Sequence, residues 1–365
     1  MNSLLKAPCE RSAVPRLIEV LSLVVIFSVG LVTAAGFLDS HIVWEHSYNE
    51  FRRALPESAV IDTHGTLWVI TRGSDQRRLL RIDSGARLLD SQYLPSSVSP
   101  EPPSDSSNFH LIILSDGRVG LLVDYSHGGR DRFFDGAKFG VFDIDGKLGA
   151  LRRVAGPGPW NNSLVSLDDG YFLILGDQAP MRISRVSASG DVVWHKDFSQ
   201  NWVGPSGAAM QNGSACIASE NYGANGMHLL LLGRTGFVQR RLDINAREGT
   251  VSTGWAGACV LLHGQSKDLA NVDLSLTSFD STLQRQWTTH VTGTVLWGAP
   301  YHLLTVSDGY IVCTDVHDGL LVMKFNFAGQ VVWSGVDSTR HAPSLAVPFR
   351  HDFYFIRFPD VVRGA

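Results

Sequence analysis

Two histidines occupy the same place in a repeated phrase of this chain. His110 opens His-Leu-Ile-Ile-Leu-Ser-Asp-Gly, and His302 opens His-Leu-Leu-Thr-Val-Ser-Asp-Gly. Both lie seven residues before the glycine, where four other units of the chain also carry polar residues: Ser58, Ser163, Ser206 and Thr250. An imidazole beside a carboxylate can act as a general acid or base, or can hydrogen-bond a ligand. This polar column lines a ligand site, or it marks strand starts that tolerate polar residues; the sequence leaves both interpretations open.

Carboxylates form a second column, seven residues after the glycine: Asp124, Asp177 and Glu220. At the ends of strands, such groups can hold a cation or contact sugar hydroxyls and basic peptide groups. Calcium requires six to eight oxygen ligands in a compact arrangement, and no single loop here supplies them. We therefore expect no metal site.

Aromatic and basic residues accompany these columns. Trp160, Trp202 and Trp297 lie ten to twelve residues before their glycines, in segments that join one unit to the next. The segment from Asp124 to Lys138 carries three further candidates, Tyr125, His127 and Arg130. Exposed Trp, Tyr and Arg are typical of binding hot spots, and loops on a rigid scaffold often carry function. Each Trp can equally well pack into the core, but as a set these residues favour binding over catalysis.

Motifs that would indicate an enzyme are missing from the sequence. It contains no Gly-x-Ser-x-Gly, no His-Glu-x-x-His, no Cys-x-x-Cys and no glycine-rich phosphate loop. We assign no catalytic residue and expect no cofactor. A His110/His302 pair with a nearby acid remains the one arrangement capable of acid-base work.

The elements that position these residues follow from the spacing of the glycines. Dipeptides ending in Gly65, Gly117, Gly170, Gly213, Gly257 and Gly309 recur at steps of 43 to 53 residues, each between two partly apolar runs. Asp-Gly or Asn-Gly between such runs predicts a two-residue β-hairpin. A hairpin repeated at this period is typical of β-propeller blades.

Each unit has a second half that ends in another turn and a Val-Val-Trp type phrase, as at Val192-Val193-Trp194 and Val331-Val332-Trp333. One unit therefore reads as a four-stranded antiparallel sheet, with the Trp packing between neighbouring blades. The phrase occurs once more at Ile42-Val43-Trp44, without three strands before it, whereas the chain end carries two strand-like runs around His351.

We therefore predict an all-β fold: a single propeller whose N-terminal strand completes the C-terminal blade. Six glycine-marked units and this composite blade give seven blades, and because the composite blade looks one strand short, six and eight remain alternatives. The propeller is expected to span residues 39–360, with a tail at 361–365.

The N-terminal region differs from the repeat. Lys6, Arg11 and Arg16 precede an apolar stretch without charges from Val20 to Leu38, with Asp39 and Glu45 after it. This pattern predicts a cytoplasmic region at 1–16 and a hydrophobic helix at 17–38. The stretch is long for a signal peptide and just long enough to cross a bilayer, so it is a signal-anchor or a cleaved signal peptide. In either case we expect the propeller outside the cytoplasm, on the periplasmic side of the inner membrane or secreted.

Charge and cysteine content narrow the function further. The net charge is −4, without the excess of Lys and Arg that a nucleic-acid-binding surface requires, so we expect no nucleic-acid partner. Cys216, Cys259 and Cys313 fall two to four residues after the glycines of three different units. Cysteines in different blades are expected to lie too far apart to pair, so we predict no disulfide.

Ser189-Gly-Asp-Val-Val-Trp194 and Ala328-Gly-Gln-Val-Val-Trp333 resemble the "NG-x-VVW" repeat of secreted bacterial propellers, which are similar to the pyrroloquinoline-quinone-like group. The resemblance implies the fold only, because the tryptophan-docking motif and vicinal cysteines of the cofactor-binding members are missing. We predict a non-enzymatic, extracytoplasmic propeller that binds a protein or peptide partner: an envelope scaffold, an assembly factor or an inhibitor of a periplasmic effector. The alternative is a carbohydrate-binding or carbohydrate-active protein that uses the channel mouth.

Overall fold

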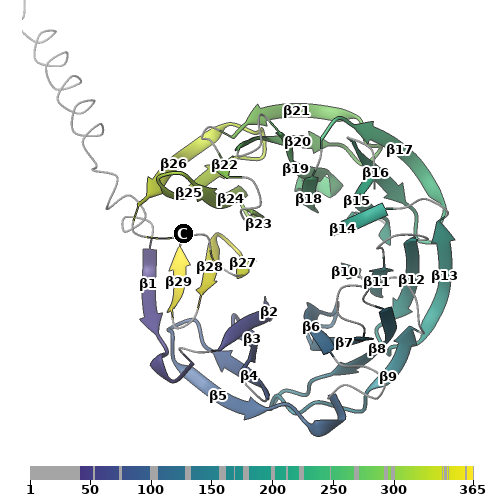
Figure 1. Ribbon diagram of the computed structural model, residues 1–365, viewed down its shortest axis with the longest axis vertical. Coiled ribbons are helices and arrows are strands. Elements are labelled where there is room, and N and C mark those ends of the chain that lie inside the picture. Colours follow the sequence, from purple (N-terminus) through teal and green to yellow (C-terminus); the bar gives the residue numbers. More distant parts are fainter. Residues whose placement is uncertain are drawn as a thin grey trace, which may run out of the picture.

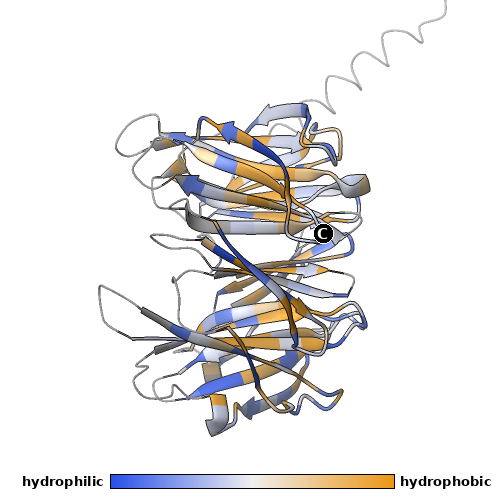
Figure 2. Cartoon of the chain, turned by 90° about the vertical axis from the view of Figure 1, so that its right-hand side faces the viewer, coloured by the Kyte–Doolittle hydropathy of each residue, from blue (hydrophilic) through white to orange (hydrophobic). Residues whose placement is uncertain are grey.

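Seven four-stranded antiparallel blades are arranged in a ring, so the chain is a seven-bladed β-propeller (Figure 1). We call the axis of this ring the channel. Seen from its edge the ring is a flat disc, with apolar residues along the strands and hydrophilic residues toward the turns (Figure 2). The computed structural model describes residues 42–51, 54–73, 76–98, 106–127, 133–155, 162–167, 169–175, 181–198, 202–210, 213–221, 226–246, 248–266, 271–291, 295–296, 301–338, 340, 343, 345–357 and 360–364.

Blades 1 to 3 each contain four consecutive strands. Blade 1 consists of β2 (Leu55–Ile61), β3 (Leu67–Arg72), β4 (Arg77–Ile82) and β5 (Leu88–Tyr93). Blade 2 consists of β6 (Ser106–Ile113), β7 (Val119–His127), β8 (Phe133–Val141) and β9 (Arg152–Ala155). Blade 3 consists of β10 (Asn162–Leu167), β11 (Gly170–Leu175), β12 (Met181–Ser187) and β13 (Val192–Phe198).

Blades 4 to 6 repeat this order. Blade 4 consists of β14 (Trp202–Ala209), β15 (Ala215–Asn221), β16 (Met227–Leu232) and β17 (Val238–Ile244). Blade 5 consists of β18 (Glu248–Thr253), β19 (Cys259–Ser266), β20 (Asn271–Phe279) and β21 (Arg285–His290). Blade 6 consists of β23 (Tyr301–Val306), β24 (Gly309–Val316), β25 (Gly319–Phe325) and β26 (Val331–Asp337). The short strand β22 (Val295–Leu296) pairs with both β20 and β24 and so links blades 5 and 6.

Blade 7 is composite, as the sequence predicts. The end of the chain supplies β27 (Leu345–Phe349), β28 (Asp352–Arg357) and β29 (Asp360–Gly364), and the N-terminal strand β1 (Ile42–Ser47) pairs with β29 as the fourth strand. The expected tail at 361–365 is therefore wrong for residues 361–364, which form β29, and the blade is not a strand short. These residues are ordered as a strand because Val361 is buried in the core between blades 7 and 1.

Helices contribute little to the described part of the chain. It contains the short 3₁₀ turns η2 (Asn49–Phe51), η3 (Ser96–Val98) and η5 (Trp255–Gly257), and nothing helical there has the length and hydropathy needed to cross a bilayer. The predicted hydrophobic helix at 17–38 lies outside the described residues.

The two faces of the disc differ in their connections. In every blade the first strand lines the channel and the fourth lies at the outer edge (Figure 1). The turns between first and second strands and between third and fourth strands lie on one side, which we call the lower face. The loops between second and third strands and the links between blades lie on the other side, the upper face.

Apolar residues fill the spaces between blades, because alternate residues of each strand point to opposite faces of a sheet. In β3, Leu67 and Val69 pack toward blade 7, whereas Trp68 and Ile70 pack toward blade 2. Each blade thus buries both faces against its two neighbours. Closing the ring removes the exposed faces that a single sheet would leave.

The Val-Val-Trp phrase has a definite role at the outer edge. Trp287 Nε1 donates to the Phe327 carbonyl oxygen (3.2 Å), and Trp194 Nε1 donates to the Arg234 carbonyl oxygen (3.2 Å). Both acceptors belong to the turn between the third and fourth strands of the next blade. Where that Trp is missing, Arg240 replaces it by donating to the Thr282 carbonyl oxygen at 2.8 Å. The repeated Trp is therefore a blade-to-blade contact.

A disulfide joins two blades, which corrects the cysteine prediction. Cys216 of β15 and Cys259 of β19 are bonded, with their Cα atoms 6.2 Å apart. Both are in second strands of adjacent blades, and both face the same apolar interface between blades 4 and 5. The expectation that different blades hold cysteines too far apart was wrong for these neighbours. Cys313 is free and buried, and burial raises the pKa of its thiol.

Candidate functional site at the upper mouth of the channel

The polar column lies where first strands surround the channel. Its six members are all in the innermost strands of blades 1 to 6: Ser58 (β2), His110 (β6), Ser163 (β10), Ser206 (β14), Thr250 (β18) and His302 (β23). Their partners differ, however, so the column is not one uniform site.

Hydroxyl members of the column join neighbouring blades. Ser58 Oγ accepts a hydrogen bond from the backbone N–H of Leu111 in blade 2 (2.8 Å). Ser206 Oγ accepts one from the N–H of Val251 in blade 5 (3.1 Å) and lies 3.0 Å from Thr250 Oγ1. A first strand has a free edge toward the channel, and these hydroxyls satisfy backbone groups along it. For these serines the structural interpretation is sufficient.

His110 is held by a buried acid of the same blade. Its Nε2 lies 3.0 Å from Asp124 Oδ2, and Asn108 Nδ2 donates to Asp124 Oδ1 at 2.9 Å. The Asp124 side chain is fully buried, whereas that of His110 is 31 % exposed. With the carboxylate as acceptor at Nε2, the imidazole is fixed in orientation, and its Nδ1 has no hydrogen-bond partner among the described residues. The structure thus brings together the two predicted residues His110 and Asp124.

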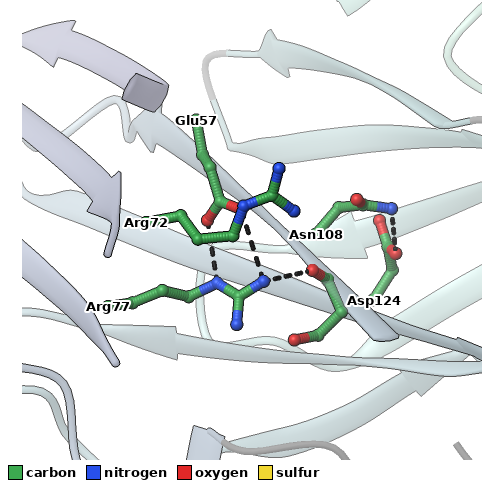
Figure 3. A network of polar contacts seen from close by, with 6 residues as sticks. Glu57, Arg72, Arg77, Asn108 and Asp124 are labelled. Carbon is green, nitrogen blue, oxygen red and sulfur yellow. Dashed lines mark hydrogen bonds and ion pairs between the residues drawn. The ribbon is translucent and has the colours of Figure 1, made fainter. Parts of the chain in front are cut away.

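A second network lies beside the first, at the upper end of blade 1 (Figure 3). Arg77 Nε donates to Glu57 Oε2 (2.8 Å), and Arg77 Nη2 donates to the Ser107 carbonyl oxygen of blade 2 (2.7 Å). The Arg77 guanidinium also lies 4.3 Å from the centre of the Phe109 ring. Arg77 therefore ties the two blades together and fixes Glu57.

Arg72 completes this network from the end of β3. Its Nε lies 3.5 Å from Glu57 Oε1, and its side chain is 52 % exposed while that of Glu57 is only 12 % exposed. Its terminal nitrogens have no hydrogen-bond partner within the described ranges. Sequence analysis missed Glu57, Arg72, Arg77 and Asn108. The sequence signal that could have indicated them is that polar residues lie at equivalent strand ends in adjacent units.

His302 has a different environment. Its Nε2 lies 3.0 Å from the Pro343 carbonyl oxygen. Burial lowers the pKa of His302, although the hydrogen bond to Pro343 acts in the opposite direction. Blades 7 and 1 separate its blade from that of His110 on the shorter way round the ring. The proposed His110/His302 pair is therefore not formed.

Other predicted site residues are dispersed. Tyr125 of β7 is buried between blades 1 and 2, with Lys138 Nζ 5.4 Å from its ring centre. Glu220 lies in β15 of blade 4, paired in register with Val203 and Met227. The backbones of Trp202 and His127 lie at the start of β14 and the end of β7. The remaining four lie outside the described residues: Trp160, Trp297, Arg130 and Asp177.

The two networks position hydrogen-bond donors against carboxylates that are largely or fully buried. Among the described residues, no group of three or more His, Cys, Asp or Glu side chains has the spacing of a metal site. What the two networks present to solvent is the Arg72 guanidinium and the His110 imidazole. Such groups recognise carboxylates, carbonyls or hydroxyls of a ligand.

Comparisons with known proteins support the fold and identify no family. No protein family and no curated protein sequence matches the chain. The resemblance to a particular bacterial repeat type consequently stays a prediction.

Solved structures resemble this chain in fold at low sequence identity. An uncharacterized protein from Listeria monocytogenes has 8 % identity and a TM-score of 0.50, over 84 % of this chain and 90 % of that one. Prolyl oligopeptidase B from Galerina marginata has 10 % identity and a TM-score of 0.50, over 86 % of this chain and 50 % of that one. A protein of unknown function from Bacteroides caccae has 16 % identity and a TM-score of 0.41, over 70 % and 88 %. The two likenesses with a TM-score of 0.50 show the fold alone.

Proposed function

We propose that this chain is a non-enzymatic, extracytoplasmic propeller that binds a protein or peptide partner through the upper face, at the junction of blades 1 and 2. In this role it is a scaffold or assembly factor of a bacterial envelope, or an inhibitor of a periplasmic effector. The resemblance to secreted bacterial propellers is consistent with that setting.

Two observations support a location outside the cytoplasm. The Cys216–Cys259 disulfide is buried between blades, and structural disulfides persist mainly in oxidising compartments. The basic residues before the apolar stretch at 17–38 favour an orientation that exports everything after it.

The observation that carries partner binding is the preorganised pair of networks around β6. Arg72 and His110 are accessible, but each is bound to a carboxylate that is largely or fully buried, Glu57 and Asp124. Side chains fixed in this way lose little conformational entropy on binding, which favours them as anchors of an interface. Arg is also enriched among interface hot spots.

Site-specific photocrosslinking in a bacterial envelope tests this proposal. A photoreactive amino acid replaces Arg72 in the full chain, and a matched chain carries it at Arg87, an exposed arginine of a lower turn that also pairs with an acid. We expect a discrete protein adduct from position 72 that His110→Ala weakens, and none from position 87. No adduct at 72, or equal adducts on both faces, would refute partner binding at this site.

A second candidate function rests on the His110–Asp124 pair. An imidazole oriented by a buried carboxylate can hydrogen-bond a sugar hydroxyl at the channel mouth. A glycan array with the wild-type chain and His110→Ala separates the two functions. Glycan binding that His110→Ala abolishes would replace the protein partner with a carbohydrate.

A further inference from the structure

We propose that the lower face of the propeller lies flat against the surface of the membrane that holds the apolar segment 17–38. The inference rests on the proposed extracytoplasmic location and on the signal-anchor alternative, in which the segment 17–38 is retained. It adds an orientation: the lower turns contact lipid, and the upper face with Arg72 and His110 points away from the bilayer.

The first step is where β1 begins. Ile42 pairs with Gly364, and Gly364 pairs with Phe353. Phe353 directly follows the first turn of blade 7 at Arg350 and His351, and Ser307 of the corresponding turn in blade 6 donates its N–H to the Arg350 carbonyl oxygen (2.6 Å). Ile42, the first residue of the described fold, therefore lies at the lower face.

The second step is the reach of the connection. Only residues 39–41 separate Leu38, the last residue of the apolar stretch, from Ile42. Four Cα steps span at most about 14 Å even when fully extended. The polar headgroup region on one side of a bilayer is roughly 5 to 8 Å thick. In an anchored chain, the lower rim of blade 7 therefore lies at the membrane surface. The plane of the disc is then either parallel to the membrane or upright, with only that rim in contact.

The third step distinguishes these two orientations. Ile144 in blade 2, Phe237 in blade 4 and Trp255 in blade 5 are 76 %, 68 % and 64 % exposed, and all three lie in lower turns. Trp255 stacks on Phe327 of the next blade, with ring centres 4.9 Å apart. These residues lie on three different blades, so a disc lying flat brings all three turns toward the bilayer, whereas a disc standing on the rim of blade 7 does not. Trp and other apolar side chains favour the membrane interface.

Charge at the lower face is compatible with lipid headgroups. Four carboxylates in these turns are paired with arginines, which reduces their repulsion of anionic lipid: Asp83 with Arg87, Asp116 with Arg118, Asp169 with Arg234 and Asp191 with Arg152. Asp143 and Asp145, which flank Ile144, are exposed and are not among these pairs. Guanidinium groups at this level can also hydrogen-bond phosphate oxygens.

The test measures the depth of labelled positions in vesicles. The full chain with Cys9→Ala is reconstituted into phosphatidylcholine–phosphatidylglycerol vesicles, with a fluorescent label at Ile144→Cys or Phe237→Cys. The matched control is Asp318→Cys, an exposed position in the upper turn between β24 and β25. The remaining cysteines do not compete, because Cys313 is buried and the other two are bonded.

Doxyl-labelled lipid should quench both lower labels strongly and leave the label at 318 unquenched. Quenching at 144 without quenching at 237 would place the disc on its rim and overturn the proposal. A chain that does not float with the vesicles, or equal quenching at all three positions, would overturn it as well. Failure of partner binding is seen separately, as loss of the adduct at position 72, so the two outcomes are distinguishable.

Discussion

Breaking the Cys216–Cys259 disulfide should destabilise the ring by an amount that the structure sets. The bonded residues are 43 positions apart. Closing a loop of about this length removes roughly 13 cal/mol/K of entropy from the unfolded chain, or about 4 kcal/mol at 25 °C. For the roughly 320 residues of the propeller, that loss corresponds to about 6 °C in melting temperature.

Chemical denaturation of oxidised and reduced wild-type protein measures this difference directly. Cys216→Ala with Cys259→Ala should lose the cross-link and also the packing of two buried sulfurs. Cys313→Ala is the matched control, because it removes a buried thiol and leaves the cross-link intact. Thiol titration in denaturant should find two reactive groups among the four cysteines before reduction, and all four after it.

The reasoning is refuted if reduction changes the free energy of unfolding by less than about 1 kcal/mol, well below the usual range for a native disulfide. It is refuted equally if the oxidised denatured chain shows four free thiols. The comparison requires a single cooperative transition in both redox states, which coincident fluorescence and circular dichroism curves establish.

Three further predictions concern the contacts that repeat around the ring. Trp287→Phe should lower the free energy of unfolding by about 1 kcal/mol, because the Nε1 hydrogen bond is lost. Trp287→Ala should lower it by about 3 kcal/mol. Urea denaturation measures both values, and equal losses for the two variants would contradict the role of the hydrogen bond. Ser206→Ala should cost about 1 to 3 kcal/mol by leaving the Val251 N–H without its acceptor, while Ser206→Thr should retain stability in the same assay. The backbone hydrogen bond from Gln284 lowers the pKa of Asp280 below its ordinary value of 3.8, so its stabilising effect is present above that pH and is lost as pH falls through the lowered value. Asp280→Asn should therefore flatten the fall in melting temperature at acidic pH, and an unchanged pH profile would exclude this role.

Much of the fold could be predicted because every blade buries both of its faces against its two neighbours in the same way. Glycine turns at Asp-Gly pairs and a Trp in the outer strand recur in the sequence because each blade needs a tight lower turn and a contact to the next blade. The misplaced phrase at Ile42 to Trp44 then predicts the composite blade. The five residues of β29 lack a glycine turn before them, so nothing local distinguishes them from a tail.

The candidate site was less predictable, because it is assembled from two blades. Arg77 and Ser107 are 30 positions apart, and no pattern in the sequence indicates that the upper end of blade 1 faces the start of β6. His110 lies in the innermost strand β6, as the column of polar residues predicts, and its contact with Asp124 was not predicted. The column could not show that His302 would instead turn to the Pro343 carbonyl, because that acceptor comes from the link into blade 7.

Pairing of β1 with β29 also constrains the order in which the molecule can be completed. Glu45 of β1 forms an ion pair with Arg340, 295 positions later, so β1 cannot take its place in blade 7 until Arg340 and β29 have been synthesised. Until then two sheet edges stay open, and open edges invite pairing with other chains. A chain without β29 would keep all six complete blades and still lack a closed ring.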